Sequence, residues 1–210
     1  VTGAVAGVTT FDITNSNGAT FNNTVNVATL DISDTENSQT VQVDGTLTAT
    51  TLTTTSNGYN VSLLGGSTIT NDASFLNTGT VTLGSANDDV LLFGGGINTS
   101  GDGSNPSGTT LAGILRTSGD QLDLGALTLG ANSVIDTTNN GGSPAGAVLN
   151  LSTVDADDAS SNDRTLTLNS GTGGAITVSG AIGATQALAG LDVTNSNGAT
   201  FTGAVTSNDG

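Results

Sequence analysis

The chain has 210 residues, 31 of them Gly and only 3% aromatic, so it lacks the large side chains that close a compact core and is expected to form a thin, elongated one. Its 18 acidic residues against two arginines give a formal net charge of −16, which argues against binding to nucleic acids or anionic lipids. Cysteine is absent, which excludes disulfides and thiolate metal sites.

Short segments in which Val, Ile, Leu or Phe alternate with small polar residues recur along the chain, a pattern typical of strands. In the N-terminal half they form three series, each with a spacing of about 20 residues. The series are 19–21, 40–43, 60–63 and 80–83; 11–13, 30–32 and 52–54; and 25–27, 47–49 and 68–70. Later strands are expected at 121–124, 147–151, 164–168 and 175–178, where the uneven spacing indicates inserted loops.

Three interleaved series predict an all-β fold, a parallel β-helix (β-solenoid) of about 20 residues per coil. Each strand would pair with its equivalent in the next coil, about 4.8 Å away, while inward apolar side chains fill the interior. Gly and Asn at 16–18, 56–58 and 139–141 are expected at corners, because corners require a positive φ.

Two other architectures have to be weighed. A string of β-sandwiches also gives repeated strands, but such domains usually bury a core aromatic residue, and this chain has no Trp and one Tyr. Disorder is common in polar, Gly-rich chains. The chain has only two Pro, a slightly positive mean hydropathy of +0.05 and strand-like alternation almost throughout, which favours a folded solenoid.

A longer repeat is visible at the two ends of the chain. The octet TNSNGATF occurs at 14–21 and again at 194–201, an offset of 180 residues, and similar residues flank both copies. We therefore expect residues 1–180 to be one β-helical tandem unit and residues 181–210 to begin the next unit, continuing the same solenoid. Nine coils per unit would rise roughly 40–45 Å. Because residue 1 is not Met, we also expect the chain to be an excerpt of a longer protein.

The phrases at 176–183, 188–193 and 199–201 resemble the repeats of very large secreted bacterial proteins, namely filamentous-haemagglutinin-like adhesins and autotransporter passenger domains. The resemblance extends over essentially the whole chain, but its motifs are degenerate and carry no site residues. It implies a right-handed β-helix, a location outside the cell or on its surface, and a role as a stalk, adhesin or fibre, including in biofilms.

The residues that could perform chemistry are few. Arg116, near Asp120 and Asp123, and Arg164, near the acidic segment 155–163, are the only cations, and there is no His, Cys or Lys to act as a nucleophile or as a base at neutral pH. The expected arrangement is solvated loop charges with local ion pairs. The sequence therefore predicts that the chain is not an enzyme.

Calcium is the one cofactor to consider, because carboxylate oxygens are its preferred ligands. Weak candidate ligands are Asp88 and Asp89 in one turn, and Asp155, Asp157 and Asp158 in another. Neither turn carries the RTX nonapeptide or the EF-hand pattern, so ordinary acidic turns are favoured. The Gly-rich segment 98–110 is expected to be an exposed excursion and a candidate contact surface.

The function that these expectations favour is a structural repeat of an extracellular fibre or adhesin. Its partners would be neighbouring repeats or copies of itself, end to end or side by side, and glycans or other cell surfaces. Nucleic acid is not expected as a partner, and no apolar run in this segment is long enough to span a membrane. The alternative is a carbohydrate-active or carbohydrate-binding β-helix similar to the polysaccharide lyases.

Overall fold

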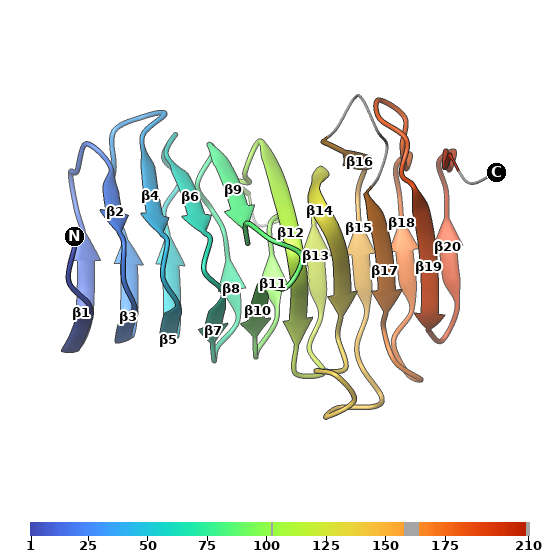
Figure 1. Cartoon of the computed structure of the whole chain (residues 1–210), viewed down its shortest axis with the longest axis horizontal. Coiled ribbons are helices and arrows are strands. Elements are labelled where there is room, and N and C mark those ends of the chain that lie inside the picture. The colour runs from blue at the N-terminus through green and yellow to red at the C-terminus, as the bar shows by residue number, and fades with distance from the viewer. Residues whose placement is uncertain (102, 158–163, 209–210) are drawn as a thin grey trace.

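The computed structural model describes residues 1–101, 103–157 and 164–208, and within these ranges every regular element is a β-strand. The strands stack into one elongated column, with the N-terminus at one end and the C-terminus at the other (Figure 1). Strands of successive coils pair in parallel throughout the described ladders. The predicted all-β parallel β-helix is thus confirmed, with about 23 residues between coils instead of about 20. The described residues contain no helix that could span a membrane.

Each coil has three faces. The first face is formed by β2 (Ala19–Phe21), β4 (Thr40–Val43), β6 (Asn60–Leu63), β9 (Thr80–Leu83), the first parts of β12 (Gly108–Thr117) and β14 (Leu127–Asp136), and β16 (Val154–Ala156). The second face is formed by the first parts of β1 (Val5–Ile13), β3 (Val25–Ile32) and β5 (Leu47–Thr54), then β7 (Ser67–Ile69), β10 (Val90–Phe93), the second parts of β12 and β14, β17 (Thr165–Asn169) and β19 (Gly190–Asn195). The third face is formed by the second parts of β1, β3 and β5, then β8 (Ala73–Ser74), β11 (Ile97–Asn98), β13 (Leu122–Leu124), β15 (Leu149–Leu151), β18 (Ile176–Val178) and β20 (Ala199–Phe201).

The register agrees with the predicted series except at one strand. The first two series pair as expected, for example Val41 with Val61 and Leu30 with Leu52. In the third series, the partner of Leu47 is Ser67, so the strand begins one residue earlier than predicted. The reason is the alternation of side chains: Ser67 is buried and Thr68 is exposed.

The interior is a narrow column of aliphatic side chains in register. On the second face, the inward column is Val25, Leu47, Ser67, Leu91, Leu115, Ile135, Leu168 and Val193. The largest fully buried side chains are those of Tyr59, Phe21, Phe75 and Phe93. Burying each large aliphatic or aromatic side chain contributes about 1.5–3 kcal/mol, so the ladder and its apolar column stabilise each other coil by coil.

Ser67 interrupts this column with a hydroxyl. Its side chain is buried between Leu47 and Leu91, and its Oγ has no hydrogen-bond partner in the described part of the chain. We expect Ser67→Ala to raise the free energy of unfolding by about 1 kcal/mol, because it removes a buried and unpaired polar group. Thermal unfolding measures the effect, and Thr68→Ala on the exposed side is the matched control. A destabilised Ser67→Ala variant would contradict this assignment.

Two of the three predicted corners use left-handed backbone. Gly18 has φ 85°, and the turn at 139–141 has φ 52°, 56° and 87°. The corner at 56–58 is different, because Gly58 lies outside the left-handed region. There a Cβ would lie 2.6 Å from Oδ1 of Asn37 in the preceding coil, so a larger residue would have to displace the Asn37 amide, which accepts a hydrogen bond from N of Gly58.

The two copies of the octet occupy different faces. The segment 11–13, just before the first copy, lies on the third face, and 19–21 within that copy lies on the first. The segment 191–193, just before the second copy, lies on the second face, and 199–201 within that copy lies on the third. The 180 residues between them pass through seven complete coils and two faces of the next. Residues 181–208 continue the stack, with Ile182 bridging Val154 and Val205.

The observed coil length corrects the expected rise of one tandem unit along the axis. Because each coil takes about 23 residues, 180 residues make about seven and two-thirds coils and rise about 37 Å, not 40–45 Å. The tandem unit itself stays a prediction. If it holds, each unit begins one face away from the unit before it.

Candidate ligand groove on the second face

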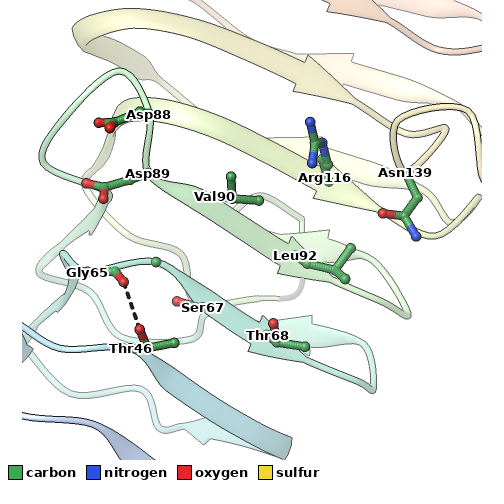
Figure 2. A pocket seen from close by; sticks show the side chains of 11 residues that line it. Thr46, Gly65, Ser67, Thr68, Asp88, Asp89, Val90, Leu92, Arg116 and Asn139 are labelled. Atoms are coloured by element: carbon green, nitrogen blue, oxygen red, sulfur yellow. Dashed lines mark hydrogen bonds between the residues drawn. The ribbon is translucent and has the colours of Figure 1, made fainter.

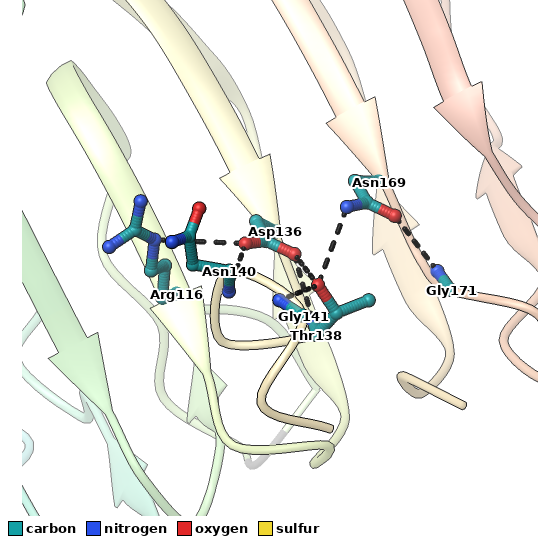
Figure 3. Close-up of polar contacts among 7 residues, drawn as sticks. All are labelled: Arg116, Asp136, Thr138, Asn140, Gly141, Asn169 and Gly171. Carbon is teal, nitrogen blue, oxygen red and sulfur yellow. Dashed lines mark hydrogen bonds and ion pairs between the residues drawn. The ribbon is translucent and has the colours of Figure 1, made fainter. Parts of the chain in front are cut away.

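Arg116 and Asp136 lie side by side on the outer surface of the second face. They are register partners on β12 and β14, and Nε of Arg116 is 3.7 Å from Oδ2 of Asp136 (Figure 3). The side chains are 22% and 7% exposed, respectively. The parallel ladder therefore brings together two opposite charges that are one coil apart in the sequence.

The carboxylate of Asp136 is hydrogen-bonded to residues of the corner that follows it. Its Oδ1 accepts hydrogen bonds from N and Oγ1 of Thr138, at 2.8 and 2.6 Å, and its Oδ2 accepts one from N of Asn140, at 2.7 Å (Figure 3). These bonds hold the left-handed turn at 139–141 in place. The carboxylate has a structural role, and Arg116 only approaches it.

Nε of Arg116 is buried and has no hydrogen-bond partner in the described part of the chain. Buried donors are nearly always paired, so an arginine N–H left without an acceptor requires an explanation. The sequence analysis expected local ion pairs around Arg116, with Asp120 and Asp123 nearby, and the ion pair that the structure shows is with Asp136. Asp123 lies on the third face, where it accepts hydrogen bonds from Asn150 and Gln121, and Arg116 lies on the second.

Arg116 lines a surface groove of about 370 Å³ (Figure 2). The other lining residues are Thr46, Gly65, Gly66, Ser67, Thr68, Asp88, Asp89, Val90, Leu92 and Asn139. They come from five successive coils, so the groove runs along the axis of the solenoid for about 19 Å, four coil spacings of about 4.8 Å. Thr46 and Asn139 come from the first and last of these coils, while Asp88 and Asp89 precede β10 in the middle coil and Arg116 lies on the neighbouring strand, opposite Leu92 (Figure 2).

The acidic side of the groove is a well-ordered turn. Oδ2 of Asp89 accepts hydrogen bonds from N and Oγ of Ser85, at 2.8 and 3.0 Å, and from N of Ala86, at 2.9 Å. Asp88 is exposed beside it. The predicted acidic turn is thus observed at this calcium candidate, and one of its two carboxylates is occupied by the turn itself.

The second acidic candidate lies elsewhere on the solenoid. Asp157 forms an ion pair with Arg164, 2.7 Å between Oδ1 and Nε, as the sequence suggested. Asp155 accepts hydrogen bonds from N of Thr185 and N of Gln186. Asp158 lies outside the described residues. Among the residues that are described, no three His, Cys, Asp or Glu side chains gather closely enough to hold a metal ion.

The predicted excursion at 98–110 is shorter than expected. Asn98 belongs to β11, Thr99 is buried, and Gly108 begins β12, so both ends of the predicted excursion belong to the coil. Ser104 in this segment contacts Ser56, 48 positions earlier in the chain, through their hydroxyls. Neither of these two serines lines the groove.

Sequence reasoning missed Asp136 and Asn139 as members of the site. The available signal was the coil period, because Asp136 follows Arg116 by 20 residues and strands one period apart become neighbours. A second signal is the outer ladder, which is Asn26, Thr48, Thr68, Leu92, Arg116, Asp136, Asn169 and Asn195 in register. Every member of this ladder is Asn, Thr or Asp except Leu92 and Arg116, and both of these residues line the groove.

Comparison with known proteins gives no assignment: no family model, no curated protein and no solved structure matches the chain. Function therefore has to be inferred from the solenoid and the groove.

Proposed function

We propose that the chain is a structural repeat of a secreted bacterial fibre or adhesin at the cell surface. The observation that supports this best is the continuous parallel ladder from the first coil to the last, around an interior filled with apolar side chains. Such a ladder resists bending and stretching, because each coil is bonded along its length to the next. A rod of this kind holds its outer faces at a fixed distance from its point of attachment.

The composition supports an extracellular setting. The charge of −16 keeps separate rods soluble, and a solenoid without cysteine needs no oxidative folding because neighbouring coils constrain each other. We propose that the partners are further copies of the repeat, and that the role is not catalytic. Of the three carboxylates near Arg116, those of Asp89 and Asp136 are held by their own turns, which leaves no free acid and base pair.

X-ray diffraction from oriented fibres of the native, full-length protein tests the proposal. We expect a meridional reflection near 4.8 Å from the coil spacing, and a unit repeat of about 37 Å. Because each unit begins one face later, the full pattern should recur after three units, or about 110 Å. Fibres without the 37 Å repeat, or isolated globular particles in electron micrographs, would contradict the rod.

A second candidate, a carbohydrate-binding β-helix, is favoured by one specific observation. The groove on the second face combines an arginine that lacks a hydrogen-bond acceptor at Nε with apolar and hydroxyl-bearing neighbours. This candidate is compatible with the first, because a rod can display a binding site on one of its faces.

A further inference from the structure

We propose that the groove binds a short saccharide that carries one carboxylate, and that Arg116 is the residue that anchors this carboxylate. The inference deepens the proposed adhesive function and rests on it, since it names what the rod would adhere to. It concerns the face formed by β7, β10 and β12 (Figure 2).

An anionic group is indicated by the state of Arg116. Its Nε is buried without a hydrogen bond, and the nearest carboxylate, that of Asp136, already accepts three hydrogen bonds from its own corner. Guanidinium groups bind carboxylates through two parallel N–H···O bonds, and such charge-assisted bonds are among the strongest in proteins. Because the buried Nε faces Asp136, a ligand carboxylate would be bound by the two terminal amino groups of the guanidinium.

The rest of the groove restricts the ligand to one negative charge. Asp88 and Asp89 stand on one side of the groove, in the turn before β10, on the coil next to that of Arg116. They would repel a second carboxylate but can accept hydrogen bonds from hydroxyl groups. Together with the net charge of −16, this disfavours polymers with a carboxylate on every unit.

A saccharide suits the rest of the groove better than a peptide does. Val90 and Leu92 are partly exposed and provide an apolar floor for sugar C–H groups, while Thr46, Thr68 and Asn139 offer polar atoms along the edges. A peptide strand would need an unpaired backbone edge, but β10 is paired on both sides, with β7 and with β12. The length of about 19 Å fits a short oligosaccharide lying along the axis.

The test is titration of the intact chain with two matched oligosaccharides, one ending in a single glucuronate and the other in glucose, followed by calorimetry and NMR. We expect the glucuronate-terminated ligand to bind at least about tenfold more tightly, and its affinity to fall as salt is added. Arg116→Gln should weaken its binding by about tenfold or more. Arg164→Gln is the matched control, because it removes the other cation, which lies at another site and is paired with Asp157.

Each remaining outcome decides against the proposal. If Arg164→Gln weakens binding as much as Arg116→Gln does, the attraction is general electrostatics and not a site. If an acidic peptide binds the groove more tightly than either sugar, the ligand class is wrong, and no binding of the acidic sugar at millimolar concentration overturns the inference. Thermal unfolding of Arg116→Gln checks that the fold is retained. Fibre diffraction is independent of these results, so failure of the groove and failure of the rod are distinguishable.

Discussion

Replacing Gly84 with Ala is expected to lower the free energy of unfolding by about 3 kcal/mol or more, the largest single effect that we predict. Gly84 has φ 76°, in the left-handed region, and a Cβ at this position would lie 1.9 Å from the carbonyl oxygen of Ala112 in the next coil. Its N–H donates to the carbonyl of Leu63 in the preceding coil, at 2.7 Å. The residue is thus held from both sides by backbone that cannot move without breaking the ladder.

The control for this variant is Gly141→Ala. Gly141 has a similar φ of 87°, but a Cβ there would meet nothing within 4 Å. The loss in free energy of unfolding for Gly141→Ala therefore measures only the strain of an alanine in left-handed backbone, which is about 1 kcal/mol. Thermal or denaturant unfolding of both variants measures the difference. Equal losses in the two variants would show that coil-to-coil clash contributes nothing at Gly84.

Replacing Tyr59 with Phe is expected to destabilise the protein by about 2 kcal/mol. Tyr59 is the only tyrosine of the chain and is fully buried in the solenoid. Its hydroxyl donates to the carbonyl of Ile32, at 2.7 Å, and accepts from N of Thr55, at 2.8 Å. Phe fills the same space but leaves both buried backbone groups without this partner, which costs about 1–3 kcal/mol. Denaturant unfolding at neutral pH measures the loss.

The same residue predicts how stability depends on alkaline pH. Burial raises the pKa of Tyr59 above its ordinary value of 10.0, with smaller upward contributions from Asp31 and Asp34. The folded state therefore holds the phenol proton more tightly than the unfolded state does. This contribution to stability is fully present below pH 10 and is lost as the pH rises through the raised pKa.

The chain suits this measurement because it has no Lys, His or Cys, so Tyr59 is the only side chain that titrates between neutral pH and the range of arginine. We expect the ultraviolet absorbance of tyrosinate to appear together with unfolding, and we expect Tyr59→Phe to lose no stability over the same pH range. An alkaline transition of equal size in Tyr59→Phe would assign it to another group.

Much of the fold could be predicted from the sequence. The alternation at 40–43, 60–63 and 80–83, with its spacing of about 20 residues, predicted both the strands and the pairing that the structure shows. The prediction succeeded because a solenoid forms its contacts between residues one period apart, so a pattern along the chain becomes a pattern in space. It failed by a few residues on the coil length because later coils contain longer turns, such as that between β14 and β15.

The candidate site was less predictable. The sequence singled out Arg116 and the turn with Asp88 and Asp89, but it could not bring them to one groove, because that requires knowing which of three faces each segment occupies. The octet illustrates the difficulty, since its two identical copies lie on different faces. A local sequence encodes a turn and a short strand, and the number of residues before it decides where in the coil they fall.

By itself, then, the sequence determined the solenoid, its polar exterior and its thin apolar interior, since these depend on alternation and composition, which are local properties. Only the tertiary structure decided the coil length, the face on which each segment lies, the pairing of Arg116 with Asp136 and the glycines that close approach requires. The physical reason is that these features depend on the summed lengths of all the turns, and each inserted residue shifts every later side chain around the coil.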